Sequence, residues 1–399
     1  MMGGNDTSVR DMVLLGLFPE LENISVLIHI IFLSYIIALF GNTILILLIW
    51  VDSRLHTPMY LLLSQLSVMD LILISTTAPK MVSDFWVENK NISQVGCGIQ
   101  MLLYITIAGA ECILLTLMSY DRYVAVCNPL RYSVIMNSRV CVQMAAFSWV
   151  VGFLDSLAHT VYIMHLPRCD SREISHFFCE FLAILKLSCE DTSAYEMILF
   201  VTGIVFILIP FGLILASYSL IFMTVFHMKS EKGKSKALAT CSSHLTVVSL
   251  YLGSGFFVLI VAPAVYSGEE SQIVSLFYNI LTPMLNPMVY SLRNKEVLGA
   301  LRKVLAMISQ FYYTNVSLGK GGQIEERRIQ NSNADGLSVA DKKKKWHCMS
   351  GLVLMQAVGF PGERMCPLGP VNNFCGPKLI LWQMASLGAP LPSSRGVPE

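Results

Sequence analysis

The chain has 399 residues, of which 54% are hydrophobic and only 14% are charged. Soluble proteins carry roughly 25% charged residues, so this composition argues against a single soluble domain and against a disordered chain. A net charge of +1 gives no basic surface for nucleic acid. The apolar residues form long blocks, and a bilayer span needs about 20 of them. The sequence therefore predicts a polytopic membrane protein.

Seven apolar runs are long enough to be membrane-spanning helices. Their approximate bounds are 24–50, 58–80, 98–122, 140–164, 195–226, 238–262 and 272–292. Asp70 interrupts the second run, and Asn279 and Asn286 interrupt the seventh. Polar residues inside a span are usually functional. The predicted fold class is an all-α membrane protein, a seven-transmembrane helix bundle with a short cytoplasmic amphipathic helix.

These runs divide the chain into four parts. We expect an extracellular tail (1–23), the seven-helix domain (24–294), an amphipathic helix (295–310) and a cytoplasmic tail (311–399). The composition of the last part predicts disorder, with weak attraction of its lysine run, Lys342 to Lys345, to anionic lipid. The alternative is an extension without a role.

Lysine and arginine decide the expected orientation. They gather in alternate loops, at Arg54, Arg131, Arg139 and four lysines between Lys229 and Lys236. The basic side is cytoplasmic by the positive-inside rule, which places the N-terminus outside the plasma membrane. Residues 1–23 are too polar for a cleaved signal peptide, so the first span serves as the targeting signal. Asn5 begins an acceptor triplet for glycosylation on that outer tail.

Four cysteines lie on the predicted outer side, where disulfides form: Cys97, Cys169, Cys179 and Cys189. Sequence alone leaves their three connectivities open. His176, Cys179 and Glu180 place an imidazole, a thiol and a carboxylate within five residues. Such ligands suit copper or zinc. The alternative is a structural loop in which Cys179 is already oxidised.

Short motifs follow one another along the runs. They are Gly41-Asn42, Leu55 to Tyr60, Asp70, Met118 to Cys127 with Asp121-Arg122, Ser217-Tyr218, Lys236 to His244, and Pro283 to Asn294. In this order and spacing the chain resembles the olfactory receptors, a branch of the rhodopsin-like G-protein-coupled receptors. The resemblance covers about residues 5–310.

The resemblance implies roles for particular residues. Asp121 and Arg122 match a switch that contacts the G protein, and Tyr218 and Tyr290 match tyrosines that approach this arginine on activation. A polar cluster inside the bundle is matched by Asn42, Asp70, Glu111 and Asn286. This cluster is a hypothetical site for a sodium ion or a retained proton, or else a structural hydrogen-bond hub.

The resemblance also implies disulfides Cys97–Cys179 and Cys169–Cys189, and the stretch from His176 to Glu180 looks like a proposed copper site of these receptors. No cofactor is required. The chain departs from the family pattern at Leu238, Ala239 and Leu252. The loss of a tyrosine at Leu252 puts a polar contact at the pocket floor in doubt.

A ligand site in a helical bundle lies between helices. Spacing on the third run predicts Met101, Tyr104, Ile105, Ala108 and Cys112 as lining residues. The resemblance adds Thr202, Val205, Phe206, Phe256, Leu259 and Asn279. This set is apolar with sparse polar groups, which favours small, neutral organic odorants. The outer half of the third run has no acid, which argues against an amine ligand.

The expected function is an odorant receptor that activates a stimulatory olfactory-type G protein and raises cyclic AMP. Receptors of this fold for a peptide or another small molecule are the nearest alternative. A transporter would show internal repeats, which the sequence lacks. An enzyme is disfavoured, because the sequence has no phosphate-binding glycine loop, His-Glu-x-x-His pair or nucleophile elbow.

Overall fold

The computed structural model describes residues 11–18, 24–87, 90–169, 172–265, 268–294, 296–307 and 309. The side chains of residues 236, 240, 254–270, 292 and 293 are not among those described. The chain divides into two units, residues 1–324 and 325–399, and every described residue belongs to the first. Asn5 and the tail from 310 onward, with its lysine run, lie outside the described residues.

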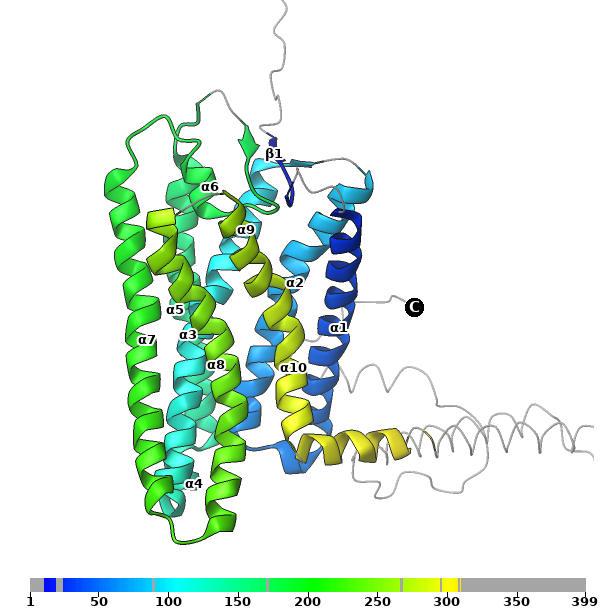
Figure 1. Ribbon diagram of the computed structural model, residues 1–399, viewed down its shortest axis with the longest axis vertical. Coiled ribbons are helices and arrows are strands. Elements are labelled where there is room, and N and C mark those ends of the chain that lie inside the picture. The colour runs from blue at the N-terminus through cyan, green and yellow to red at the C-terminus, as the bar shows by residue number, and fades with distance from the viewer. Residues whose placement is uncertain are drawn as a thin grey trace, which may run out of the picture. The chain divides into compact units, whose positions relative to one another are not determined.

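Within the described residues, seven long helical segments run side by side, which confirms the predicted all-α bundle (Figure 1). They are α1 (Ile24–Val51), α2 (Pro58–Val87), α3 (Gln94–Cys127), α5 (Ser138–His165), α7 (Ser193–His227), α8 (Glu231–Val265), and a broken seventh segment. That last segment consists of α9 (Gly268–Leu276), the π-helical turn η3 (Phe277–Leu281) and α10 (Thr282–Arg293). Short turns η1 (Ser53–Leu55), η2 (Pro129–Arg131) and α4 (Tyr132–Ile135) lie at one end, and α6 (Phe181–Leu185) lies at the other.

The helices extend beyond the apolar runs that predicted them. Side-chain caps explain two of the early starts, because Ser93 accepts a hydrogen bond from the Gly96 amide and Asn137 accepts one from the Val140 amide. These caps satisfy backbone donors that the first turn of a helix leaves unpaired. Helix α8 begins at Glu231, seven residues before the apolar run, because polar residues continue a helix once it leaves the lipid.

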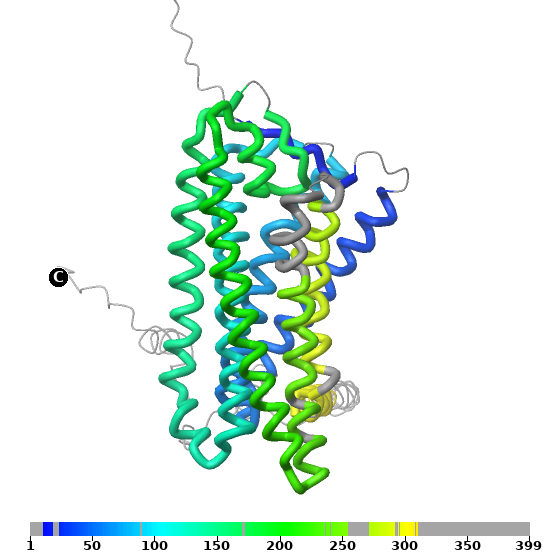
Figure 2. The backbone as a smooth tube through the Cα atoms, turned by 60° about the vertical axis from the view of Figure 1, so that its left-hand side comes forward, coloured from blue at the N-terminus to red at the C-terminus, as the bar shows by residue number. Residues whose placement is uncertain are grey.

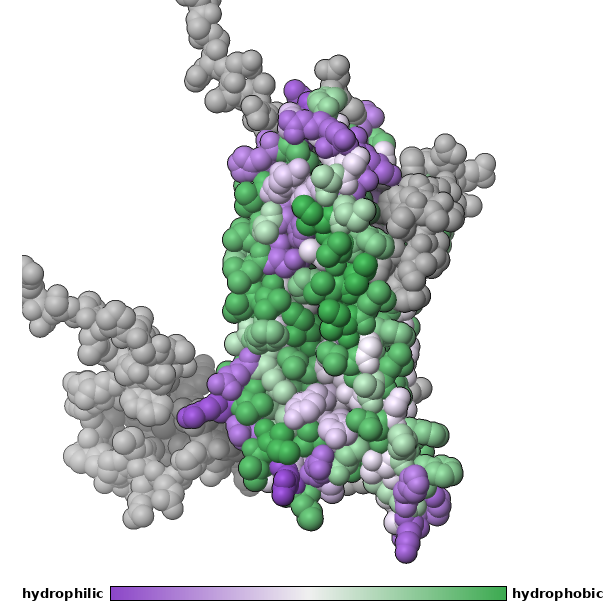
Figure 3. Space-filling model, turned by 90° about the vertical axis from the view of Figure 1, so that its left-hand side faces the viewer, coloured by the Kyte–Doolittle hydropathy of each residue, from purple (hydrophilic) through white to green (hydrophobic). Residues whose placement is uncertain are grey.

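Five of the helices, α1, α2, α3, α5 and α7, are each long and apolar enough to cross a membrane, as judged within the described residues. Seen from the side of α7, the bundle surface shows a broad apolar band, with hydrophilic residues gathered mainly at its two ends (Figure 3). Large apolar side chains of α1, α5 and α7 are exposed on the bundle surface, among them Phe40, Phe153 and Phe222. Lipid contact accounts for such exposure, which water would penalise.

Helix α3 lies at the centre of the bundle and packs most extensively against α5, with further contacts to α7 and α2. The contact with α5 depends on Gly152. A Cβ atom at this position would lie 2.6 Å from the Thr106 carbonyl oxygen and 2.8 Å from the Ala110 nitrogen. The backbones of the two helices therefore approach as closely as only glycine permits.

Gly152→Ala is expected to destabilise the bundle by about 1–3 kcal/mol, because the added methyl group must push α3 and α5 apart. Gly212→Ala in α7 is the matched control, since a Cβ there meets nothing within 4 Å. Thermal unfolding of detergent-purified protein and cell-surface staining measure the effect. Equal behaviour of the two variants would contradict this account of α3–α5 packing.

A small sheet closes the end of the bundle that the sequence predicts to lie outside the cell. Strand β1 (Met12–Leu14) pairs antiparallel with β2 (Asn91–Ile92) and parallel with β3 (Glu173–Ile174). The register places Val13 opposite Asn91 on one side and Glu173 on the other. Met12 and Leu14 are buried. The N-terminal segment, expected to be a plain tail, thus lies across the loop end of the helices (Figures 1 and 2).

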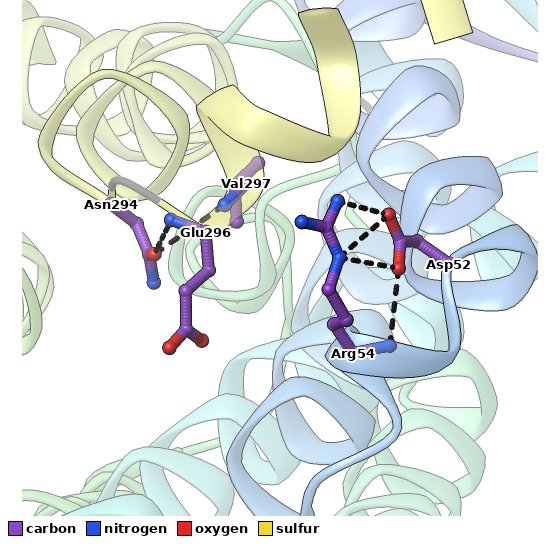
Figure 4. Close-up of polar contacts among 5 residues, drawn as sticks. All are labelled: Asp52, Arg54, Asn294, Glu296 and Val297. Carbon is purple, nitrogen blue, oxygen red and sulfur yellow. Dashed lines mark hydrogen bonds and ion pairs between the residues drawn. The ribbon is translucent and has the colours of Figure 1, made fainter. Parts of the chain in front are cut away.

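The opposite end holds the start of the amphipathic helix, residues 296–307. Asn294 accepts hydrogen bonds from the backbone amides of Glu296, at 2.9 Å, and Val297 (Figure 4). The Tyr60 hydroxyl of α2 donates to Glu296 and accepts from the Asn294 amide, both at 2.8 Å. These contacts fix the helix beside α2. Val297 and Ala300 are buried against the bundle, whereas Arg302 and Lys303 are exposed.

An ion pair lies in the first turn after α1, on this same end. Arg54 folds back onto Asp52, with a 2.6 Å contact between Nη2 and Oδ2 (Figure 4). The hydrogen bonds from Arg54 lower the pKa of Asp52 to about 2. Asp52 also caps η1 by accepting from the Arg54 amide. The pair therefore fixes the turn between α1 and α2.

Candidate functional site

A cavity of about 210 Å³ lies among α3, α5, α7, α8 and the seventh segment. Its wall from α3 carries Tyr104, Ile105, Ala108, Gly109 and Cys112. The α7 wall carries Leu199, Thr202, Gly203, Phe206 and Ile207, which recur at three- and four-residue steps and so share one helix face. The remaining lining residues are Asp155, His159, Phe181, Tyr251, Leu252, Val274, Ser275 and Tyr278.

The structure places six of the eleven predicted ligand residues on this cavity: Tyr104, Ile105, Ala108, Cys112, Thr202 and Phe206. Met101 is instead buried in the packing around the outer disulfide. Val205 lies off the lining face of α7 and is 46% exposed. Asn279 is buried and donates to the Ser275 carbonyl of its own segment. The side chains of Phe256 and Leu259 lie outside the described part.

Sequence reasoning missed the polar residues of α5. Asp155 and His159 are four residues apart, so they share a helix face, and both line the cavity. A carboxylate in the apolar run 140–164 was the available signal, because charged residues within a span face the interior. Leu252, where the family pattern has a tyrosine, also lines the cavity, while the neighbouring Tyr251 directs its hydroxyl at the Ala108 carbonyl oxygen.

The predicted polar cluster forms three separate contacts inside the bundle. Asn286 donates to both carboxylate oxygens of Asp70 at 3.0 Å, and Tyr278 donates to Glu111 at 3.1 Å. Asn42 of α1 donates to the Pro283 carbonyl at 2.9 Å and so ties α1 to α10. Within the described residues, one oxygen each of Asn42, Glu111 and Asn286 has no hydrogen-bond partner. Buried oxygens of this kind fit a hard cation or water.

The predicted switch residues lie near the ends of α3, α7, α8 and α10 that the sequence predicts to face the cytoplasm. Arg122 pairs with Asp121, which also accepts a 2.8 Å hydrogen bond from the Tyr132 hydroxyl of α4. Tyr218 contacts His244 of α8 at 2.6 Å. The Tyr290 hydroxyl has no partner within the described residues. In this arrangement the guanidinium is held by its neighbouring carboxylate.

Two disulfides hold the outer loop. Cys97 of α3 is bonded to Cys179, and Cys169 is bonded to Cys189. The Cys179 amide also donates to Gln100 of α3 at 2.9 Å. Because Cys179 is oxidised, the set His176, Cys179 and Glu180 has no thiolate to offer copper. Among the described residues, no group of three His, Cys, Asp or Glu side chains is placed to hold a metal ion.

His176 and Glu180 are buried in this loop. The ring of His176 contacts Phe177 and Phe178, and neither ring nitrogen has a hydrogen-bond partner among the described residues. Burial lowers the pKa of His176 to about 3. Burial also raises the pKa of Glu180 to about 7. Glu180 caps α6 by accepting a hydrogen bond from the Ala183 amide.

Acidification changes the contributions of His176 and Glu180 to folding stability in opposite directions. The unfolded chain protonates His176 near its ordinary pKa of 6.5 and the folded chain does not, so His176 lowers stability as the pH falls below 6.5. Glu180 takes up its proton earlier in the folded chain, so stability rises as the pH falls from about 7 to 4.5. One pKa unit corresponds to about 1.4 kcal/mol.

His176→Phe is therefore expected to gain stability on acidification from about pH 7 to about pH 5, relative to the unmodified chain. The variant keeps the aromatic packing and removes the opposing histidine. Thermal unfolding midpoints of purified protein across this interval measure the difference. His165→Phe is the control, because His165 is exposed. Identical pH profiles for the His176 variant and the unmodified chain would refute the assignment.

Comparison with known proteins identifies the scaffold that carries this cavity. A family model described as "Olfactory receptor" matches residues 31–308. The chain belongs to the olfactory receptor family. It is 50% identical to human olfactory receptor 2T11 over 304 residues, which cover 76% of this chain and 96% of that receptor. It is 52% identical to human olfactory receptor 2T2 over 295 residues, 74% of this chain and 91% of the relative.

A mouse protein shows the same pattern. Olfactory receptor 2V1 from mouse is 48% identical over 301 residues, 75% of this chain and 96% of its own length. Membership makes this protein a seven-transmembrane G-protein-coupled receptor and not an enzyme. It also makes it a multi-pass protein of the plasma membrane, in agreement with the apolar helices. The prediction of family and fold class from the motifs is confirmed.

Proposed function

We propose that this protein is an odorant receptor that binds small, mostly apolar organic molecules in the cavity among α3, α5, α7 and α8. The cavity itself is the observation that carries the proposal, because its walls are largely aliphatic and aromatic with a few polar groups. Burial of a ligand there contributes about 0.8 kcal/mol per methylene. The volume of about 210 Å³ suits a small molecule.

The bound ligand acts by shifting the population of receptor states, and only a difference in its affinity for those states moves the equilibrium. In the active state Arg122 leaves Asp121 and contacts a stimulatory olfactory-type G protein, which raises cyclic AMP. Tyr218 and Tyr290 then approach Arg122. The basic loops at this end face the cytoplasm, so the N-terminus with Asn5, a glycosylation site, is outside the cell.

The cluster of Asp70, Glu111 and Asn286 supplies the oxygen ligands that a sodium ion would use in the resting state. Its unpartnered oxygens, Glu111 Oε1 and Asn286 Oδ1, are of the right chemical type. Residues 24–294 form the receptor domain, residues 295–310 the amphipathic helix, and residues 311–399 a tail that signalling does not need.

Odorant-evoked cyclic AMP in transfected cells tests the proposal. A broad odorant panel is expected to include agonists, and Arg122→Ala is expected to abolish their response while receptor remains at the cell surface. Arg139→Ala is a control, because Arg139 is an exposed basic residue on a different helix, α5. No response to any odorant, with a response to a peptide, would overturn the proposal. So would an unchanged response in Arg122→Ala.

A further inference from the structure

The cavity has a polar corner where α5 faces α7. Asp155 lines it, and among the described lining residues Asp155 is the one with a carboxylate. The Oδ1 atom of Asp155 lies 3.5 Å from the Nε2 atom of His159, which is long for a hydrogen bond. The other ring nitrogen of His159 lies 2.6 Å from the Tyr195 hydroxyl of α7. His159 is therefore oriented by Tyr195, and the carboxylate keeps capacity to accept a shorter hydrogen bond.

Several hydroxyl groups of the cavity lining already donate their hydrogens to other atoms of the protein. Tyr278 donates to Glu111 at 3.1 Å, and Thr202 donates to the Leu199 carbonyl at 3.0 Å. Tyr251 donates to the Ala108 carbonyl. A hydroxyl whose hydrogen is committed still offers its oxygen as an acceptor. Asp155 and these three hydroxyl oxygens therefore offer acceptors to a ligand, while the Ser275 hydroxyl of the seventh segment can also donate.

We propose that Asp155 is the residue that selects the ligand class, and that this class is alcohols: an apolar body with a hydroxyl that donates to the Asp155 carboxylate. The inference rests on the function proposed above and narrows it. An ether, ester or aldehyde of the same size brings only acceptors to the Asp155 carboxylate. Its oxygen would be buried without a donor, which costs free energy. The alcohol instead makes a charge-assisted hydrogen bond.

The position of Asp155 makes it a specificity residue rather than part of the switch. It lies on α5, whereas Asp121 and Arg122 lie near the inner end of α3. Substitutions at Asp155 should therefore change which molecules bind and leave coupling to the G protein intact.

Isomeric pairs of ligands give the sharpest test. Hexanol and methyl pentyl ether have the same atoms and differ in the hydroxyl donor, and hexanal keeps a terminal oxygen without that donor. A set of such triplets, linear and branched, is applied to cells that express the receptor, with hexylamine and its homologues as a cationic arm. Cyclic AMP is measured together with ligand-induced thermal stabilisation of purified receptor, which does not depend on signalling.

We expect alcohols to act at about tenfold lower concentration than their ether isomers, the size of one hydrogen bond to a charged group. Asp155→Leu should remove this difference. Asp155→Asn adds an amide donor, so aldehydes should gain relative to alcohols. Asp191→Asn removes an exposed carboxylate of the outer loop and should change nothing. Surface staining of each variant serves as the check that it folds and reaches the cell surface.

Ethers as potent as alcohols, or a preference unchanged in Asp155→Leu, would overturn the inference while the odorant function stands. If the receptor preferred amines and Asp155→Asn removed that preference, the ligand class would be cations, and the inference of alcohols would likewise be overturned. A polar preference lost in Ser275→Ala instead would move the contact to the seventh segment and refute the role of Asp155. No response or stabilisation by any odorant would overturn the proposed function itself.

Discussion

Replacement of Cys97 by serine is expected to remove most of the receptor from the cell surface and to abolish odorant-evoked cyclic AMP. The Cys97–Cys179 bond joins the start of α3 to the outer loop across 82 residues of chain. Loss of a native disulfide typically costs about 2–5 kcal/mol, a large share of the stability of a folded domain. Cys179→Ser should behave in the same way.

The neighbouring contacts explain why other interactions do not compensate. Cys97 and Cys179 are fully buried, beside Met12 and Ile174 of the small sheet. Gln100 accepts from the Cys179 amide and donates to the Thr76 carbonyl of α2 at 2.9 Å. One covalent bond thus positions the outer loop, the N-terminal strand and two helices. Its loss releases α6, whose Phe181 lines the ligand cavity.

Cys127→Ser is the matched control for this experiment. Cys127 is a free cysteine of the same helix, α3, at its inner end, and its sulfur contacts the Thr224 hydroxyl, a partner that serine can also reach. Surface staining and cyclic AMP should stay near those of the unmodified receptor. Normal surface levels of Cys97→Ser would show that the outer loop is held without the disulfide.

Sequence patterns predicted the positions of the helices well, because a helix that crosses a bilayer must be predominantly apolar over its whole span. Spacing on α3 also placed Tyr104, Ile105, Ala108 and Cys112 on the cavity, since a regular helix keeps one face toward its neighbours. Val205 shows the limit of analogy on α7. The lining face there runs through Thr202, Gly203 and Phe206, and Val205 falls outside it.

Other features depend on contacts that a linear pattern does not contain. The seventh segment contains a π-helical turn at Phe277–Leu281, and within this turn Tyr278 lines the cavity whereas Asn279 does not. Such single-turn insertions have no reliable sequence signature. Strand β1 is only three residues long, and its partners β2 and β3 lie far away in the sequence, so the sheet escaped prediction. Asp155 belongs to none of the motifs, and its one signal, a carboxylate inside an apolar run, went unused.

Asp121→Asn is expected to raise basal cyclic AMP several-fold per receptor at the cell surface. Asp121 is fully buried, pairs with Arg122 and accepts from the Tyr132 hydroxyl at 2.8 Å. An amide in its place leaves the buried guanidinium without its charged partner. Breaking a buried ion pair costs about 3–5 kcal/mol. This penalty falls mainly on the resting state, because Arg122 turns toward the G protein in the proposed active state.

A difference of about 1.4 kcal/mol between the two states already shifts their ratio tenfold, so part of that penalty is enough to activate the receptor without ligand. Tyr132→Phe removes one neutral hydrogen bond and keeps the ion pair, so its effect should have the same sign and be smaller. Asp84→Asn breaks the Lys80–Asp84 pair at the outer end of α2 and should leave basal signalling unchanged. If Asp121→Asn reached the surface without raising basal cyclic AMP, the Asp121–Arg122 pair would be a structural contact and not a restraint on activation.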